Sequence, residues 1–245
     1  MTRGWRKLLP LLALLLGAAD VRPTQDYLSP EIRAAQEDPS RHPGWLWVEE
    51  GEALWGRGEP SCAACHGNIA GMAGVAARYP LVATDGALLD LEGRIERCRT
   101  QHQGESAFGR ESEPLLALAA AIALQSRGMP VAVATDGPAA AFLEEGRHFY
   151  ETRQGQLNLS CGQCHDNNAG RRLRGDVISN GLGTGYPAYR LEWNTMGSLH
   201  RRLRACSLGV RAEQFPLGSR EYLTLELFLA SRANGLPVEA PGLRR

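Results

Sequence analysis

Lysine is nearly absent from this chain of 245 residues. Lys7 is the only lysine, so arginine supplies the rest of the 27 basic residues. Positive charge is not in excess either, because 27 acidic residues balance it and the formal net charge is zero. Nucleic-acid-binding proteins carry clustered excess positive charge, so the balance argues against nucleic acid as a partner. Any anion that side chains bind here is expected to be held by arginine forks.

Long hydrophobic runs are missing as well. The N-terminal apolar run, from Leu8 to about Leu16, is shorter than the roughly 20 residues that a membrane-spanning helix needs. It follows three basic residues and precedes small residues that end at Ala19. This pattern predicts a secretory signal peptide over residues 1–19, cleaved near Ala19, rather than an uncleaved membrane anchor. We therefore expect a periplasmic protein with no membrane span after cleavage.

Six cysteines in an exported protein would by default form three disulfides. Four of them instead belong to two attachment motifs, which are Cys62-Ala63-Ala64-Cys65-His66 and Cys161-Gly162-Gln163-Cys164-His165. In this pattern two thiols bond covalently to a haem and the adjacent histidine ligates its iron. The sequence therefore predicts two c-type haems, attached through Cys62, Cys65, Cys161 and Cys164, with His66 and His165 as iron ligands.

The regions around the two motifs are repeats of one another. Val48-Glu49-Glu50-Gly51 is echoed by Leu143-Glu144-Glu145-Gly146, and a segment ending in Cys98 is echoed by one ending in Cys206. Each half then continues through an apolar segment to Ser-Arg, a glycine turn and Pro-Val. The unit is typical of a cytochrome c domain: a helix, the motif, a loop, a cysteine-bearing helix and a final helix.

The repeat predicts a mainly α fold of two tandem cytochrome c-like domains related by internal duplication. We expect the first domain over residues 20–131, a linker over 132–138, and the second domain over 139–245.

The sixth iron ligand is not an obvious methionine or histidine. Met72, Met129 and Met196 do not occupy equivalent places in the two halves, and neither do His102 and His200. The halves do share Cys98 and Cys206, each preceded by arginines that favour the thiolate form. Each cysteine is thus a candidate ligand of its own haem iron. The alternative is a Cys98–Cys206 disulfide, the default in an oxidising compartment.

The two halves differ in charge. From His66 to Gln103 there are four arginines and four acids, whereas from His165 to Arg211 there are eight arginines and three acids. Haem propionates occur in both halves and cannot explain this difference, so an oxyanion substrate near the second haem is expected. The glycine-rich segment from Gly181 to Gly185 allows backbone to approach a ligand or partner closely.

The chain resembles the SoxA family, the dihaem subunits of SoxAX cytochrome complexes, over nearly the whole mature sequence. The resemblance is carried by Pro43 to Glu49, Gly51 to Trp55 and, most specifically, Arg202 to Ala212. It implies that Cys206 is both the distal ligand of the second haem and the catalytic sulfur, often found as a persulfide. It also implies that Cys98 ligates the first haem and that Arg202 holds the anionic substrate.

The implied reaction couples thiosulfate oxidatively to a cysteine of the SoxYZ carrier protein, forming a cysteine S-thiosulfonate. Two electrons would pass to the monohaem partner SoxX, with which the chain would form a heterodimer. The alternative function is a dihaem electron-transfer cytochrome without catalysis of its own.

Overall fold

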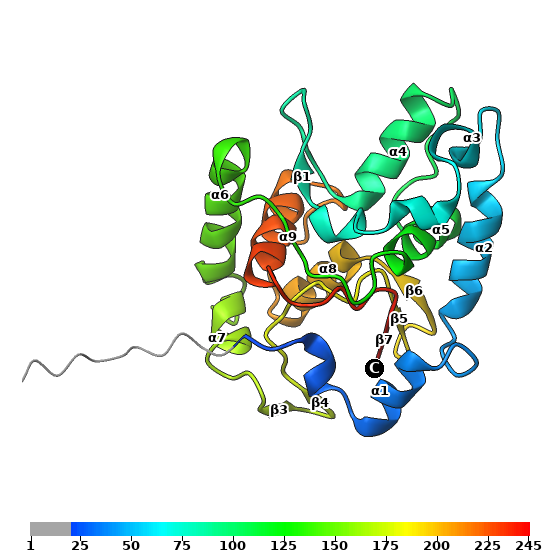
Figure 1. Cartoon of the computed structure of the whole chain (residues 1–245). Coiled ribbons are helices and arrows are strands. Elements are labelled where there is room, and N and C mark those ends of the chain that lie inside the picture. Colours follow the sequence, from blue (N-terminus) through cyan, green and yellow to red (C-terminus); the bar gives the residue numbers. More distant parts are fainter. Residues whose placement is uncertain (1–20) are drawn as a thin grey trace, which may run out of the picture.

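The computed structural model describes residues 21–245 (Figure 1), so the signal peptide expected over residues 1–19 lies outside the described residues. The described helices are α1 (Pro30–Glu37), α2 (Trp45–Trp55), α3 (Cys62–His66), α4 (Leu91–Gln101), α5 (Glu113–Leu124), α6 (Ala140–Glu151), α7 (Cys161–His165), α8 (Leu199–Gly209) and α9 (Arg220–Arg232), with four short 3₁₀ turns, η1 (Thr24–Tyr27), η2 (Ile69–Met72), η3 (Ala76–Arg78) and η4 (Gly137–Ala139). The strands are β1 (Leu81–Val82), β2 (Leu88–Leu89), β3 (Arg172–Leu173), β4 (Asp176–Val177), β5 (Ala188–Arg190), β6 (Thr195–Gly197) and β7 (Gly242–Arg244). Among these helices, none combines the length and apolar character needed to cross a bilayer.

The same order of helices occurs twice. A long helix, a one-turn motif helix, a loop, a cysteine-bearing helix and a final helix appear as α2, α3, α4 and α5, and again as α6, α7, α8 and α9. In Figure 1 the first set occupies the upper right and the second set the left and centre. The prediction of a mainly α fold built from two similar cytochrome c-like halves is confirmed.

In each half the first and last helices cross at a glycine. A Cβ at Gly51 on α2 would lie 2.1 Å from the carbonyl oxygen of Ala117 on α5. A Cβ at Gly146 on α6 would lie 2.0 Å from the carbonyl oxygen of Thr224 on α9. These glycines are the equivalent residues of the two Glu-Glu-Gly segments. Only glycine permits such close contact between two helix backbones, so the duplicated sequence preserves the crossing.

The two halves share part of their hydrophobic core. One cluster of buried residues contains Ala77, Leu88 and Ala123 from the first half and Leu182 and Leu227 from the second. Separate clusters lie within each half, around Trp55 and Leu115 in the first and around Tyr150 and Leu225 in the second. The shared cluster fixes the orientation of the halves because burial of apolar area stabilises their contact.

The segments that close the two repeats pair with each other. Pro130 and Pro237 form an antiparallel bridge. On either side of it, the Gly128 amide donates to the Val238 carbonyl and the Val131 amide donates to the Leu236 carbonyl, both at 2.9 Å. Val133, inside the expected linker 132–138, is 5% exposed and belongs to the shared core. The exact domain boundaries at residues 131 and 139 stay a prediction.

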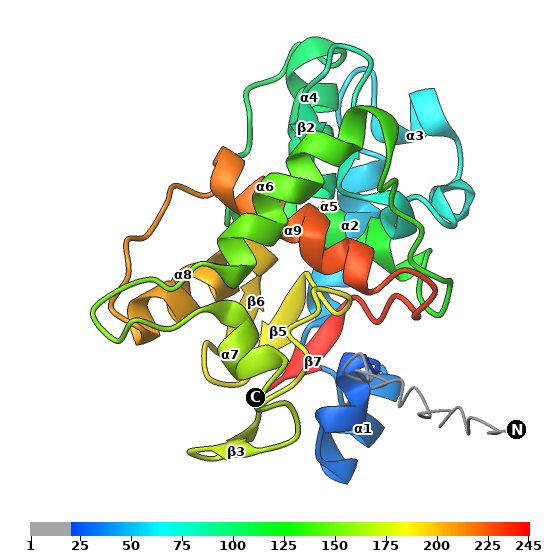
Figure 2. The ribbon, with the colours of Figure 1, turned by 90° about the vertical axis from the view of Figure 1, so that its left-hand side faces the viewer.

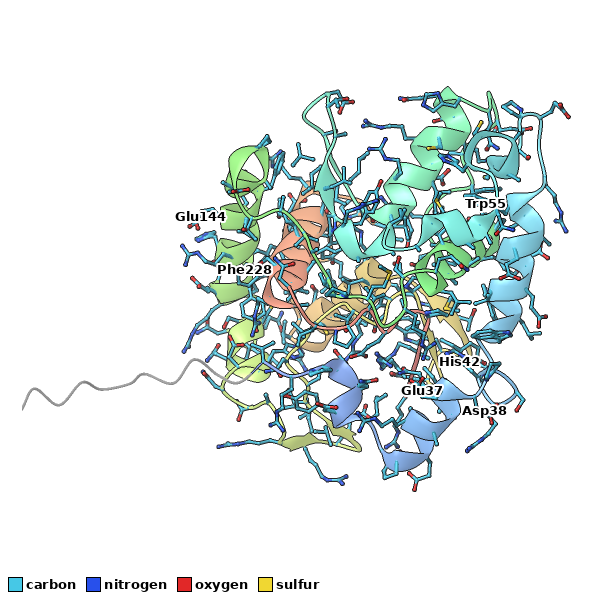
Figure 3. All side chains as sticks on the ribbon, in the orientation of Figure 1. Glu37, Asp38, His42, Trp55, Glu144 and Phe228 are labelled. Carbon is cyan, nitrogen blue, oxygen red and sulfur yellow. The ribbon has the colours of Figure 1, made fainter. Side chains whose placement is uncertain are left out.

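A small sheet connects the termini to the second half. Strand β5 pairs with β6 antiparallel and with β7 parallel, so the C-terminal strand joins a hairpin that leads directly into α8. Helix α1 lies beside β7 (Figures 1 and 2). Figure 3 labels Glu37 at the end of α1, whose carboxylate lies 3.2 Å from the Arg127 guanidinium just after α5. The N-terminal segment thus contacts both halves.

Candidate functional site

Each attachment motif lies on one capped helical turn. The Ser61 hydroxyl accepts the Ala64 amide at 3.1 Å at the start of α3. At the start of α7, the Ser160 hydroxyl accepts the Gln163 amide at 3.3 Å, and the Gln163 side chain accepts the Ser160 amide at 2.9 Å. These caps satisfy amides at the helix start and place both thiols and the histidine of each motif on a single turn.

The imidazole of His165 is fixed by a backbone carbonyl. Its Nδ1 lies 2.8 Å from the carbonyl oxygen of Ser179, and because a carbonyl can only accept, Nδ1 carries the proton. The lone pair is then on Nε2, the form in which histidine binds a metal. Gly181, two residues farther, has φ of +74°, and a Cβ there would lie 2.8 Å from His165 Cγ. The glycine-rich segment thus approaches the predicted iron ligand.

The first motif has a different support. The indole nitrogen of Trp55 donates to the Gly67 carbonyl at 2.9 Å, and the Trp55 and His66 rings have centroids 5.8 Å apart. Cys65 and His66 are exposed, whereas Cys164 and His165 are half-buried. The protein therefore encloses the second motif more than the first.

The two lone cysteines occupy equivalent places on equivalent helices. Asp90 caps α4 by accepting the Gly93 amide at 2.7 Å, and Ser198 caps α8 by accepting the Arg201 amide at 3.1 Å. Cys98 and Cys206 follow their caps at the same spacing. Each therefore projects from the same turn of its helix toward its own half of the molecule.

Each lone cysteine lies close to its own attachment motif. Burial, followed by the neighbouring Cys98 thiol, raises the pKa of Cys62. Burial, followed by Cys206, raises the pKa of Cys161 to about 12. All six cysteines are free, so the alternative of a Cys98–Cys206 disulfide is not formed. The structure thus separates the two cysteines into two sites, called here the first pocket (Cys62, Cys65, His66 and Cys98) and the second pocket (Cys161, Cys164, His165 and Cys206).

The residues of each pocket fit a covalently attached haem. The second half offers two thiols, an imidazole nitrogen whose tautomer suits metal ligation, and the Cys206 sulfur, which interacts with that imidazole. The first half offers the equivalent set, namely Cys62, Cys65, His66 and Cys98. Thiols that bond to haem and axial nitrogen and sulfur ligands are the donor types of c-type and thiolate-ligated haem proteins. Each half therefore carries the side chains that one such group requires.

The two axial cysteine candidates have opposite electrostatic environments. Burial raises the pKa of Cys98, and Arg94 and Arg97 offset only part of that effect. Burial also opposes the thiolate of Cys206, but the His165 imidazole and the positive charges of Arg202 and Arg190 outweigh it and lower the pKa. The second pocket thus stabilises a negative charge that the first pocket does not.

The largest cause that lowers the pKa of Cys206 is its contact with His165, and a second difference between the pockets lies in one pair of equivalent arginines. Arg94 and Arg202 each lie four residues before the lone cysteine, on the same face of the helix. The Nε of Arg94 donates to the Tyr79 hydroxyl at 3.1 Å. The Arg202 side chain is half-buried, and its guanidinium has no hydrogen-bond acceptor and no carboxylate within 4.0 Å among residues 21–245. All donors of this guanidinium are therefore available to an anion, whereas Arg94 already uses its Nε.

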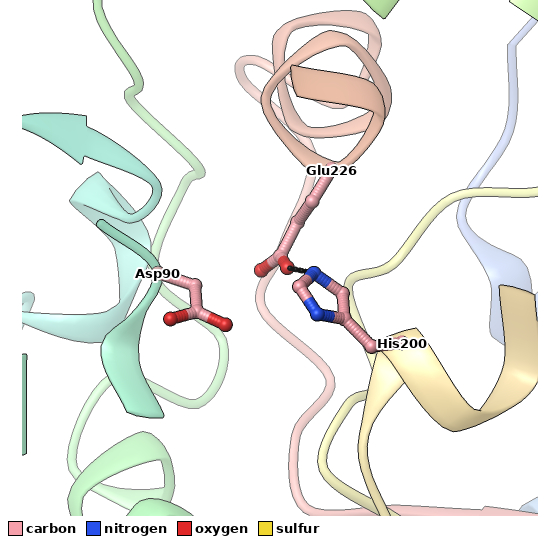
Figure 4. A group of neighbouring side chains, drawn as sticks. All are labelled: Asp90, His200 and Glu226. Carbon is pink, nitrogen blue, oxygen red and sulfur yellow. Dashed lines mark ion pairs between the residues drawn. The ribbon is translucent and has the colours of Figure 1, made fainter. Parts of the chain in front are cut away.

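A buried polar cluster outside these pockets resembles a metal site (Figure 4). The side chains of Asp90, His200 and Glu226 bring possible ligand atoms within 4.8 Å of one another. However, His200 Nδ1 accepts the Gly218 amide at 3.0 Å, so its proton is on Nε2, which lies 2.9 Å from Glu226. Arg110 donates to both oxygens of Asp90. With no imidazole lone pair facing the centre, this cluster is a polar network, with an ion pair between Arg110 and Asp90, that joins the halves.

Sequence reasoning missed the groups that distinguish the pockets. The Ser179 carbonyl lies 14 residues along the chain from its partner, His165. The Tyr79 hydroxyl lies 15 residues from its partner, Arg94. Arg190 is one of the eight arginines of the second half, and no motif singles it out. Its position at the end of β5, immediately before the turn into β6, is the one local signal.

Comparisons with known proteins agree with this geometry. A family profile described as SoxA/TsdA, cytochrome c domain, matches residues 50–131 and 145–238. The L-cysteine S-thiosulfotransferase subunit SoxA of Rhodovulum sulfidophilum is 39% identical over 92% of this chain and 80% of its own length. The equivalent protein of Paracoccus pantotrophus is also 39% identical, over 86% of this chain and 75% of its own.

A solved structure extends the likeness to three dimensions. A chain of the crystal structure of SoxXA from P. pantotrophus superposes with a TM-score of 0.88 at 37% identity, covering 92% of this chain and 87% of that one. The two attachment helices and the two cysteine-bearing helices lie within the residues that the family profile matches. The chain belongs to the SoxA/TsdA cytochrome c family and, within it, to the SoxA proteins.

Proposed function

We propose that this chain is the catalytic subunit that couples thiosulfate to a cysteine of a SoxYZ carrier protein and passes two electrons to a SoxX cytochrome, with which it forms a heterodimer. The observation that carries the proposal is the Arg202 guanidinium one helical turn before Cys206, which has no hydrogen-bond acceptor among residues 21–245. The names of the relatives support it, since they are L-cysteine S-thiosulfotransferase subunits. The heterodimer is supported by the likeness to a chain of SoxXA.

Two covalent c-type haems complete the proposal. Cys62 and Cys65 would attach the first, and His66 and Cys98 would ligate its iron. Cys161 and Cys164 would attach the second, and His165 and Cys206 would ligate its iron. The second haem would supply an electron acceptor.

The protein's own residues hold and orient the reactants. Arg202 offers a planar fork of donors that matches the oxygens of a sulfonate group, and so binds thiosulfate by that end. Its outer sulfur is then directed toward Cys206, four residues later on α8. Cys206 Sγ would bond to that outer sulfur, with loss of its own proton and of two electrons to the cytochrome partner. The carrier thiol would then attack the same outer sulfur, give up its proton to Cys206 and displace the Cys206 sulfur.

The overall reaction balances as an oxidative coupling. A new S–S bond forms between the outer sulfur of thiosulfate and the carrier cysteine sulfur, and the S–H bond of that cysteine breaks. The products are the cysteine S-thiosulfonate, one proton and two electrons, and the cytochrome partner receives the electrons. No further oxidant is needed in the pocket.

Export to the periplasm completes the proposal. The basic and apolar N-terminus predicts a cleaved signal peptide, and covalent haem attachment through two cysteines suits a protein assembled outside the cytoplasm. Residues 20–131 and 139–245 would form the two haem domains, joined by residues 132–138.

The test compares equivalent cysteines. Cys206→Met, in the haem-loaded chain with its cytochrome partner and carrier, should lower thiosulfate coupling by more than about 100-fold because the receiving sulfur is lost. Cys98→Met is the matched control and should cost less than about tenfold. Full coupling by Cys206→Met would instead identify the chain as an electron carrier.

The number of haems is tested separately by the intact mass of the mature protein. Two covalent haem additions are expected, and Cys62→Ser with Cys65→Ser should remove one of them. A mass showing a single addition in the unmodified protein would contradict the dihaem assignment.

A further inference from the structure

Arg190 is a buried guanidinium whose donors are largely unsatisfied. It ends β5 and is 6% exposed. Its Nε has no hydrogen-bond partner in the described chain. One terminal nitrogen lies 3.5 Å from the Tyr186 hydroxyl, and the other lies 3.3 Å from Glu192, whose side chain is 64% exposed. Burial of the Arg190 guanidinium with so few acceptors is unfavourable, so we expect an additional acceptor to bind it.

Arg190 and Arg202 lie on neighbouring elements of the second half. Arg190 ends β5, whose hairpin partner β6 ends at Gly197, and α8 begins at Leu199. Arg202 lies on α8, one turn before Cys206. The short connection through β6 thus joins the two guanidinium-bearing elements, β5 and α8. Both are anchored in the folded core rather than on a surface loop.

Two other arginines of this region, Arg244 and Arg201, are already neutralised or partly exposed. Arg244, on the adjacent strand, donates to Glu239 at 2.6 Å and to Gln36. Arg201 lies 3.7 Å from Glu111 and has a side chain that is 39% exposed. Arg190 therefore differs from its neighbours in being both buried and short of acceptors.

We propose that Arg190 and Arg202 form a two-arginine oxyanion site beside Cys206. The ligand is an anion with at least two oxygens on one centre, which accepts from the Nε and a terminal nitrogen of Arg190. Two sources share this chemistry: the sulfonate end of thiosulfate and a propionate carboxylate of the second haem. If the ligand is the sulfonate of thiosulfate, the proposal rests on the proposed function. If the ligand is a propionate, it does not, because a propionate belongs to the haem and not to the substrate.

A purely structural role is the competing explanation. The Arg190 guanidinium also lies 5.1 Å from the centroid of the Trp193 ring, a cation–π contact that helps to hold the turn after β5. That role requires a cation over the ring but no oxyanion. Arg190→Lys retains the cation and loses the fork, so it separates the two roles.

The experiment uses the haem-loaded chain and the variants Arg190→Gln, Arg190→Lys and Arg220→Gln. Arg220 is the matched control because it is an exposed arginine on α9 that pairs with Glu145 at 2.7 Å. Thiosulfate binding is measured by calorimetric titration, the potentials of both haems by redox titration, and folding by thermal unfolding.

If the sulfonate is the source, Arg190→Gln should raise the dissociation constant for thiosulfate by about tenfold or more, as expected for a lost charged hydrogen bond. Arg190→Lys should recover only part of that loss. If the propionate is the source, thiosulfate binding stays unchanged and the potential of one haem shifts. Arg220→Gln should match the unmodified protein in every readout.

Unchanged thiosulfate affinity and unchanged potentials in a folded Arg190→Gln variant would overturn the proposal. So would full recovery of both by Arg190→Lys, which would indicate the structural role. These results are independent of catalysis. Retained coupling by Cys206→Met would refute the proposed function while leaving the anion-binding measurement intact.

Discussion

Gly181 packs against the imidazole of His165, so closely that a Cβ at residue 181 would lie 2.8 Å from Cγ and 2.9 Å from Nδ1. The same imidazole is held from its Nδ1 by the Ser179 carbonyl at 2.8 Å. One loop therefore sets both the orientation and the tautomer of the second histidine. The loop residue must be glycine for two reasons, since it has a positive φ and no room for a side chain.

The substitution Gly181→Ala should displace the His165 ring. We expect a loss of stability of about 1–3 kcal/mol and an altered absorption and electron paramagnetic resonance spectrum of the second haem. Gly235→Ala is the control, because Gly235 also has a positive φ of +85° but no atom within 4 Å of its would-be Cβ. It should lose stability without a spectral change. Equal stability loss and unaltered spectra in both variants would contradict the positioning role of Gly181.

Arg202→Gln should weaken thiosulfate use. We expect KM for thiosulfate to rise by about tenfold, with haem spectra nearly unchanged, because a charged hydrogen bond to the substrate is lost. Arg94→Gln is the matched change in the first half, where the guanidinium is already bonded to Tyr79. It should change KM by less than about twofold. Steady-state kinetics with the carrier protein measures both, and equal effects would remove the proposed distinction between the pockets.

Glu92 should make stability fall as pH rises. Burial, then the nearby Asp90 carboxylate, raises its pKa well above the ordinary 4.5, against the effect of Arg110. Glu111 and Glu226 also face it and add to the increase. The folded state thus keeps a proton on Glu92 that the unfolded state releases above about pH 4.5. The free energy of unfolding therefore decreases from that pH up to the pKa of Glu92 in the folded state, by at most about 1.4 kcal/mol per pH unit.

Glu92→Gln should remove this part of the pH dependence. The difference in unfolding free energy between the variant and the unmodified protein should grow in favour of the variant as pH rises above 4.5. Glu52→Gln, on the exposed face of α2, is the control and should follow the unmodified protein at all pH values. The free energy of unfolding is measured by denaturant titration at pH values from about 5 to about 8, the range in which proteins tend to be most stable. Parallel curves for all three proteins would rule out a raised Glu92 pKa.

Gly146→Ala should disrupt the crossing of α6 and α9. Its Cβ would meet the Thr224 carbonyl at 2.0 Å, so the helices must separate, at a cost of about 3 kcal/mol. Gly56→Ala, at the end of α2, has its nearest neighbour at 3.9 Å and should change stability by less than about 0.5 kcal/mol. Thermal unfolding compares the two, and similar melting temperatures would show that the crossing tolerates a methyl group.

Features that depend on short stretches of sequence could be predicted. The attachment motifs, the helix order and the duplication follow from residues a few positions apart, and the structure reproduces that order. Serine before each motif is a local helix-start signal, and both serines act as caps. The glycine-rich segment indicates a close approach of backbone to another group, but no sequence pattern identifies His165 as its partner.

His200 shows the limit of such prediction. In the sequence it is one of two histidines near a lone cysteine, and nothing local identifies its partners. In the folded protein it is 1% exposed and lies 2.9 Å from Glu226, 26 residues later, close to Asp90 from the other half. Its role in this buried polar network depends on the docking of the two halves, which no local pattern encodes.

By itself the sequence determined the class of protein, because covalent haem attachment, helix periodicity and repeats are carried by residues close together in the chain. Only the tertiary structure decided how the two pockets differ. The Arg94 Nε donates to the Tyr79 hydroxyl, whereas the Arg202 guanidinium has no acceptor among residues 21–245 and lies one helical turn before Cys206. The two arginines occupy equivalent sequence positions. The distinction therefore arises from side chains that folding brings to one helix and not to its duplicate.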